Sequence, residues 1–304
     1  MQNQSIKKQP GWRPAMYTDT EGEYSWYDNL FPLPSDEEAL DSYVGHDKLV
    51  SFRQAAHHFR NRKSFKIGDF GIEGLDKLTG GMHEGELVVI SGLTKHGKTL
   101  LAQTASSNLA RQQVASTWFT FEVPPSQFLE PFTGNEMMMD HCYMPLEHKA
   151  YNLKWLFWRI LEGNRKAGSK VIFIDHLHFI MDIARSRNPS LEVGTIVRAL
   201  KRLAVDRMLC IVLICHVSKG QKEVDDDSYE NLRDSSLIAQ ESDTVIFVRR
   251  RPDVGDGVAK ITVDFHRRTG AMKQVAWAVK VGPYLKSMTY EEEPRRKHRY
   301  DIDD

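Results

Sequence analysis

The stretch SGLTKHGKTL, residues Ser91–Leu100, decides the fold of this chain. It follows the apolar run ELVVI and contains two glycines five positions apart, followed directly by a lysine and a threonine. A glycine-rich loop between a strand and a helix presents backbone N–H groups to an anion, and the lysine can reach the β- and γ-phosphates. The residues predicted to bind a nucleoside triphosphate are Gly92, Leu93, Thr94, Lys95, His96, Gly97, Lys98 and Thr99.

The composition is that of an ordinary soluble protein. Lys plus Arg number 41 in the 304 residues, as do Asp plus Glu, so the formal net charge is zero. The net charge therefore neither indicates nor excludes binding to nucleic acid. The cysteines Cys142, Cys210 and Cys215 form no C-x-x-C pair, which predicts reduced core residues with no zinc module or disulfide scaffold. No apolar run reaches membrane-spanning length, and MQNQSIKKQP lacks a signal-peptide core. We therefore expect a cytoplasmic protein that does not bind membranes.

Short runs rich in Val, Ile and Phe alternate with helical stretches after residue 70. The predicted strands are ELVVISG, STWFTFE, SKVIFIDH, MLCIVLICH and DTVIFVRR, and the helices are expected at 99–113, 151–168 and 193–208. Strands that alternate with helices indicate an α/β fold with a mostly parallel sheet flanked by helices. The segment 257–279 is typical of two later antiparallel strands.

Four regions are expected from these patterns: an irregular acidic and aromatic arm at 1–36, a linker helix region at 37–66, an α/β nucleotide-binding domain at 67–288, and a charged disordered tail at 289–304. Acidic residues recur from 17 to 47 with no Lys or Arg among them. The arm is either a frayed terminus or a segment that docks on a neighbouring subunit or partner.

Polar residues end three of the apolar runs. Asp175 ends KVIFID and is a candidate Mg²⁺ ligand together with the Thr99 hydroxyl. Glu122 ends STWFTFE and is our preferred residue for polarising the attacking water, with Asp182 as the alternative. His216 ends MLCIVLICH and is either a sensor of the γ-phosphate or a histidine satisfied in a surface loop.

In their order these segments resemble the RecA-like motor domain of hexameric replicative helicases of the DnaB type, especially the helicase half of phage and mitochondrial primase-helicases. The resemblance extends from about Phe70 to Val281 and implies that the domain at 67–288 is a RecA-like ATPase motor. It places Glu122 on the family's catalytic glutamate and Asp175 on its metal-directed aspartate. His216 then falls on the sensor position, which is histidine in the phage primase-helicases.

The resemblance also implies an arginine finger, which reaches the γ-phosphate of a neighbouring subunit. The matching text is DFHRRTG, 264–270, which has phenylalanine where the family has lysine. Arg267 is the candidate finger and Arg268 the alternative. Upstream, Gln240 and Asp243 keep their expected places.

The family threads single-stranded DNA through a ring, gripped by two loops. In this sequence the loops would follow Asp175 and His216, and the DNA-binding candidates are Arg185, Arg187, Lys219 and Lys222. Each of these charges can equally be an ordinary solvated loop residue.

The expected function is an ATP-dependent (or dTTP-dependent) DNA helicase motor that moves on single-stranded DNA as a homohexamer, phage-encoded or phage-like, with Mg²⁺. A separate primase, polymerase or loader is the expected partner, because no zinc cluster or primase-like segment precedes the motor. The alternatives are a RecA- or RadA-like DNA-dependent ATPase without unwinding activity, and a non-hydrolysing ATP clamp.

Overall fold

The computed structural model describes residues 48–60, 65–149, 153–176, 189–216 and 235–289. The chain divides into two units, 1–62 and 63–304. The arm at 1–36, the water-polarising alternative Asp182 and the four DNA-binding candidates lie outside the described residues, as does the tail beyond residue 289. No helix in the described part of the chain is both long and apolar enough to cross a membrane.

The described part of the first unit contains one helix, α2 (Phe52–Phe59), which lies within the region where a linker helix is expected. A capping box begins it: Ser51 Oγ accepts from Gln54 N at 3.2 Å, and Gln54 Oε1 accepts from Ser51 N at 2.9 Å. The domain boundaries drawn from the sequence remain predictions.

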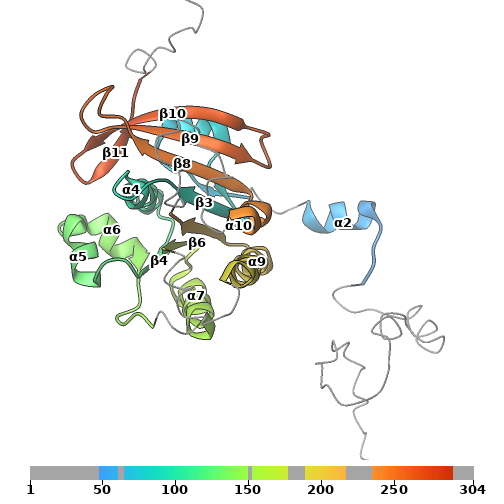
Figure 1. The fold of residues 1–304 in the computed structure, drawn as a ribbon. Coiled ribbons are helices and arrows are strands. Elements are labelled where there is room, and N and C mark those ends of the chain that lie inside the picture. Colours follow the sequence, from blue (N-terminus) through green and yellow to red (C-terminus); the bar gives the residue numbers. More distant parts are fainter. Residues whose placement is uncertain (1–47, 61–64, 150–152, 177–188, 217–234, 290–304) are drawn as a thin grey trace, which may run out of the picture. The chain divides into compact units, whose positions relative to one another are not determined.

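The second unit is an α/β domain built on a nine-stranded sheet (Figure 1). Its strands are β3 (Leu87–Ser91), β4 (Ser116–Thr120), β5 (Cys142–Tyr143), β6 (Val171–Asp175), β7 (Cys210–Ile214), β8 (Thr244–Arg250), β9 (Val258–His266), β10 (Met272–Val281) and β11 (Tyr284–Ser287). Two further short strands, β1 (Lys66–Gly68) and β2 (Met82–His83), pair with each other. The helices are α3 (Glu73–Thr79), α4 (Lys98–Arg111), α5 (Pro125–Leu129), η1 (Glu130–Phe132), α6 (Glu136–His141), α7 (Leu153–Ala167), α9 (Pro189–Arg207) and α10 (Ser235–Glu241).

The strand order is β11-β10-β9-β8-β3-β7-β6-β4-β5. The strands from β8 to β5 run parallel, and β9, β10 and β11 extend the sheet in antiparallel fashion. The prediction of a mostly parallel sheet followed by an antiparallel pair is therefore confirmed. The strand predicted from STWFTFE ends at Thr120, because the chain turns there into Pro124 and Pro125.

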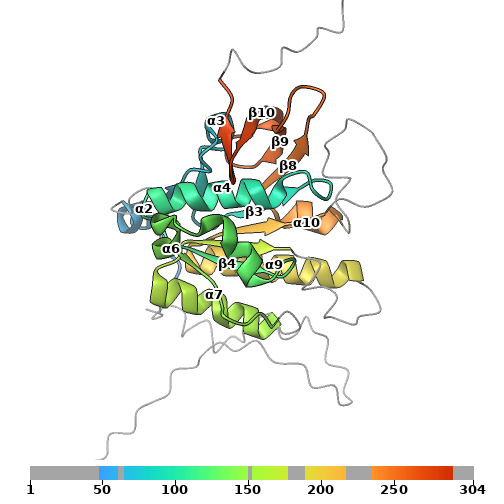
Figure 2. The same cartoon turned by 90° about the vertical axis from the view of Figure 1, so that its left-hand side faces the viewer.

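Helices cover both faces of the sheet, because successive strand residues point to opposite sides. Val88 and Ile90 of β3 face the core that α3, α4, α5 and α6 close, and Leu87 and Val89 face the core under α7, α9 and α10. In Figure 1, α4 and α6 lie to the left of the central strands and α9 lies to their right, and in Figure 2, which views the molecule from that left side, α4 and α6 are in front. Every residue of β3, β4, β6 and β7 is buried, which explains why these strands are nearly continuous apolar runs.

The register brings the carboxyl ends of the central strands to one edge of the sheet. Thr120 of β4 pairs with Asp175 of β6, Asp175 pairs with Ile214 of β7, and Ile214 pairs with Ile90 of β3. Any residue one or two positions beyond these four lies at that same edge. The phosphate loop starts there, directly after β3.

Gly92 should be hard to replace, because it begins the phosphate loop at φ +146° and a Cβ there would collide with the Val248 carbonyl oxygen of β8. Gly92→Ala should lower the free energy of unfolding by about 3 kcal/mol. Urea denaturation of the nucleotide-free protein measures this change. Gly168→Ala is the control: Gly168 also has positive φ, but nothing lies within 4 Å of its added Cβ, so it should cost only about 1 kcal/mol. Equal losses for the two variants would contradict the steric argument.

Candidate active site

The phosphate loop joins β3 to α4, and two of its residues have a left-handed backbone conformation. Lys95 and Gly97 have φ of 67° and 97°, and Gly97 serves as the N-cap residue of α4. No side chain caps this helix end within the described residues, so its first N–H groups remain available to an anion. The far side of the loop is tied to the sheet, because Arg250 N at the end of β8 donates to His96 Nδ1 at 3.2 Å.

Lys98 lies at the bottom of this loop and is almost fully buried. Its ammonium donates to the Leu93 carbonyl oxygen at 2.9 Å, across the loop. Burial lowers the pKa of Lys98, whereas the carboxylates of Glu122 and Asp175 act in the opposite direction. A buried cation at the base of the loop is suited to receiving an anion there, because the anion would supply the charge that compensates its lost hydration.

Thr99 and Asp175 meet across the gap between α4 and β6. The Thr99 hydroxyl donates to Asp175 Oδ2 at 2.8 Å. Asp175 is 1% exposed, and burial raises its pKa to about 6 despite this hydrogen bond. Its second oxygen, Oδ1, is buried and has no hydrogen-bond partner in the described part of the chain.

An unsatisfied buried carboxylate oxygen beside a hydroxyl fits a hard cation, because Mg²⁺ takes oxygen ligands and keeps several waters. Thr99 and Asp175 are therefore the residues that could hold Mg²⁺ at this loop. Such an ion would also compensate the cost of burying the aspartate.

Glu122 lies two residues beyond β4, at the same ends of the strands as Asp175 and the phosphate loop. Its Oε2 is 3.4 Å from His176 Nδ1 and 4.0 Å from His216 Nε2. The two imidazole rings meet edge to face, with centroids 4.4 Å apart. The Glu122 side chain is 38% exposed, so its carboxylate contacts solvent. Burial lowers the pKa of Lys98 and raises the pKa of Asp175, and the charge of Glu122 acts to raise both pKa values.

The two candidate arginine fingers lie at the opposite ends of the central strands from the phosphate loop. They follow β9, whose last residue, His266, pairs with Thr244 at the start of β8. Arg267 N donates to the Asp243 carbonyl oxygen at 2.8 Å, and its exposed side chain donates to the Gln240 carbonyl oxygen. Since β3 rises about 3.3 Å per residue, roughly 13 Å of strand separates this turn from the phosphate loop of the same chain.

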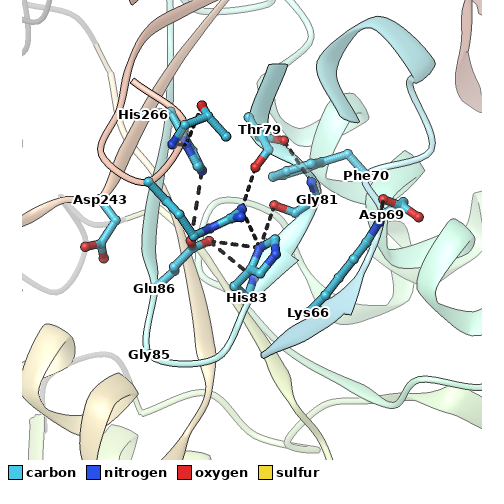
Figure 3. A network of polar contacts seen from close by, with 12 residues as sticks. Lys66, Asp69, Phe70, Thr79, Gly81, His83, Gly85, Glu86, Asp243 and His266 are labelled. Carbon is cyan, nitrogen blue, oxygen red and sulfur yellow. Dashed lines mark hydrogen bonds and ion pairs between the residues drawn. The ribbon is translucent and has the colours of Figure 1, made fainter. Parts of the chain in front are cut away.

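Arg268 is engaged within its own domain, where it joins the polar contacts around Thr79, His83 and Glu86 (Figure 3). Its guanidinium donates to Glu86 Oε1 at 3.2 Å and to the Thr79 carbonyl oxygen at 2.6 Å, and contacts His83 Nδ1 at 2.9 Å. Burial raises the pKa of Glu86, and the hydrogen bond from Arg268 opposes that rise. Arg268 therefore anchors the turn, whereas Arg267 makes its contacts outside this network.

Asp243 joins the turn to the rest of the domain. Its Oδ2 accepts from Leu87 N at 2.7 Å and from Lys201 Nζ of α9 at 2.6 Å. Its backbone carbonyl accepts from Arg267 N. One residue thus connects the start of β3, the helix α9 and the turn that carries Arg267.

Comparison with known proteins identifies the family. The model of the DnaB-like helicase C-terminal domain matches residues 69–146 and 137–281, which is most of the chain. The chain belongs to this family. A probable plasmid replicative DNA helicase of Chlamydia psittaci is 24% identical over 260 residues, covering 72% of this chain and 56% of that protein.

Solved structures show the same fold. One solved ATPase domain superposes with a TM-score of 0.67 at 15% identity, covering 79% of this chain and 99% of that one. A DnaB-like replicative helicase, solved in a study of its interactions with primase, gives a TM-score of 0.69 at 13% identity and covers 86% and 73% of the two chains. The present DnaB-like chain spans about half the length of the curated relatives it matches: 56% of the Chlamydia psittaci protein and 50% of the replicative helicase DnaB of Haemophilus influenzae.

The structure brings the phosphate loop, Glu122, Asp175 and His216 together and leaves Arg267 apart from them. Sequence reasoning missed His176 and the anchoring network of Arg268. The signal for His176 was present, because it directly follows Asp175 at a strand end. No local pattern points to the Arg268 network, since its partners Thr79, His83 and Glu86 are more than 180 residues away in sequence.

The stability of the folded protein should decrease in acid because of the buried His266 at the end of β9. The pKa of His266 is lowered to about 4, first by burial and then by the charges of Arg268 and His83. The folded protein keeps the imidazole neutral while the unfolded chain takes up a proton below about pH 6.5, so stability should fall as the pH decreases from about 6.5 towards 4. His266→Gln cannot be protonated and should lose less stability over this window, as measured by urea denaturation at several pH values.

The matched control for this titration is His57→Gln, which replaces an exposed histidine of α2. It should follow the wild-type pH profile. A profile for His266→Gln as steep as that of the wild type would show that the buried imidazole is not the cause.

Proposed function

We propose that this chain is the ATP-dependent motor of a replicative-type DNA helicase. The observation that carries the proposal is the convergence at one sheet edge of the phosphate loop, the Thr99–Asp175 pair and Glu122. These groups are what hydrolysis of a nucleoside triphosphate needs: a cradle for phosphates, a cation site and a carboxylate near water. Membership of the DnaB-like family and the replicative helicases among the relatives support the coupling to DNA.

Each residue has a defined part in hydrolysis. The N–H groups of the loop and the Lys98 ammonium hold the phosphates of ATP or dTTP, and the lysine exchanges its contact with the Leu93 carbonyl for one with phosphate oxygen. Glu122 accepts a proton from the attacking water, because its carboxylate is partly exposed beside the buried site. His216 hydrogen-bonds the γ-phosphate and reports its loss. Thr99 and Asp175 would hold Mg²⁺, which would supply positive charge next to the phosphates when bound.

The position of Arg267 supports a ring of subunits. Arg267 cannot reach the phosphate loop of its own chain, because it lies at the opposite ends of the central strands. We propose that it reaches the γ-phosphate bound by a neighbouring copy, in a homohexamer. Exposed apolar residues on α2 support contact with a neighbour as well: Phe52 is 95% exposed and Phe59 is 50% exposed.

Single-stranded and forked DNA are the proposed substrates, bound by Arg185, Arg187, Lys219 and Lys222 inside the ring. A primase carried on a separate chain is the proposed partner, since one structural relative was solved in a study of its interactions with primase. A polymerase or a loader would join the same assembly.

Strand displacement tests the proposal. With ATP and Mg²⁺, wild-type protein should release the labelled strand of a forked duplex, and Lys98→Ala should release none. Glu122→Gln should still bind nucleotide but hydrolyse it about 10²–10⁴-fold more slowly. Lys77→Ala is the control lysine variant, because Lys77 lies exposed on α3, where it forms an ion pair with Glu73 at 2.7 Å.

Two outcomes would change the proposal. DNA-stimulated hydrolysis without strand release would favour a RecA-like ATPase that does not unwind. Absence of both DNA stimulation and strand release would contradict the helicase motor.

Mixed subunits test the arginine finger. Arg267→Ala alone should lower ATP hydrolysis by about 10³-fold or more. Mixing it with Lys98→Ala protein, which is itself inactive, should restore part of the activity, because some interfaces then combine an intact loop with an intact Arg267. No recovery on mixing, with both variants forming hexamers, would contradict action across subunits.

A further inference from the structure

One group of three potential metal ligands converges within the described residues, and it is separate from the oxygen pair of Thr99 and Asp175. Glu122, His176 and His216 each offer one ligand atom, and these atoms all lie within 4.8 Å of one another. The Glu122 Oε2 to His176 Nδ1 distance of 3.4 Å matches the spacing of about 3.4 Å between ligands of a tetrahedral Zn²⁺ with bonds of about 2.0–2.1 Å. The distance of 4.0 Å to His216 Nε2 requires a small rotation of one ring.

The backbone that leads to the three residues is hydrogen-bonded to neighbouring strands. They follow β4, β6 and β7, whose last paired residues form one continuous row. Pairing continues beyond the strands, because Phe121 N donates to the Asp175 carbonyl at 2.6 Å and Cys215 N donates to the Ile90 carbonyl at 2.9 Å. The three side chains thus start from fixed points at the same edge, which reduces the cost of bringing them onto one ion.

The surroundings provide access for an ion. The Glu122 side chain is partly exposed, whereas His176 and His216 are largely buried. A cation that enters from solvent would meet the carboxylate first and the imidazoles behind it. Three protein ligands leave one position for water, as in zinc sites with an open coordination position.

The ligand types select the cation. Imidazole nitrogen suits Zn²⁺, Co²⁺ and Ni²⁺, whereas Mg²⁺ prefers oxygen. We propose that Glu122, His176 and His216 form a binding site for a divalent cation of the Zn²⁺, Co²⁺ or Ni²⁺ class. The site needs only these three side chains and is independent of the motor activity proposed above. When that activity is present, a cation here occupies Glu122 and stops it from accepting a proton.

Direct binding tests the site. Zn²⁺, and separately Co²⁺, is titrated into nucleotide-free and Mg²⁺-free protein in competition with a chromophoric chelator. Wild type should bind one equivalent more tightly than Glu122→Gln, His176→Gln and His216→Gln by at least about tenfold. These variants keep side-chain size, and far-UV circular dichroism checks that each one is folded.

The control is His141→Gln. His141 is a half-buried histidine of α6 whose ring contacts the Met137 carbonyl at 3.1 Å, outside the cluster. This variant should retain the tight equivalent. The chain has twelve histidines, so equal Zn²⁺ uptake by wild type and all four variants would mean dispersed surface binding and would overturn the site.

Thermal unfolding gives a second readout. An ion that binds only the folded chain raises its melting temperature in proportion to the logarithm of ion concentration over dissociation constant. Zn²⁺ should stabilise wild type and His141→Gln and have little effect on the three ligand variants, and chelation should reverse the shift. Identical shifts in all five proteins would contradict the proposal. Both measurements use no nucleotide or DNA, so their failure is distinguishable from failure of the helicase proposal.

Discussion

The parallel register of β3, β7, β6 and β4 is the constraint on which the rest of the structure depends. Because each strand ends at the same edge, the loop that follows each one contributes a polar group to a common place. The four strands are buried throughout, and their polar residues lie near the strand ends. The groups proposed for nucleotide hydrolysis therefore lie together at one end of these four strands.

Burial at that end of the strands gives the site its electrostatic character. Asp175 and Lys98 lose water on folding, which raises the pKa of the aspartate and lowers that of the lysine. The aspartate keeps one oxygen without a partner among the described residues, and the lysine donates to a loop carbonyl that a phosphate could replace. Burying such groups costs stability in the folded protein, and a bound nucleotide with its cation is what would satisfy them.

The opposite end of the strands has a different organisation. There the Arg268 guanidinium contacts Glu86, His83 and the Thr79 carbonyl oxygen, and the Asp243 carbonyl oxygen accepts from Arg267 N, so the turn is held in place from two sides. The network leaves Arg267 on the outside of the domain. A turn held by these hydrogen bonds suits the proposed contact of Arg267 with a neighbouring subunit, because little backbone freedom remains to be lost there.

The sequence by itself determined the class of fold, and it predicted a phosphate-binding loop between a strand and a helix. Continuous apolar runs indicate buried parallel strands, and a glycine-rich loop between a strand and a helix is typical of phosphate binding. It also placed Glu122, Asp175 and His216 at strand ends, since a run that stops at a charged residue marks the edge of the core. Strand order, register and the contacts between distant segments were decided only by the tertiary structure. The meeting of His176 with Glu122 and the engagement of Arg268 depend on strands that are neighbours in space and remote along the chain, and local residue patterns carry no information on such pairings.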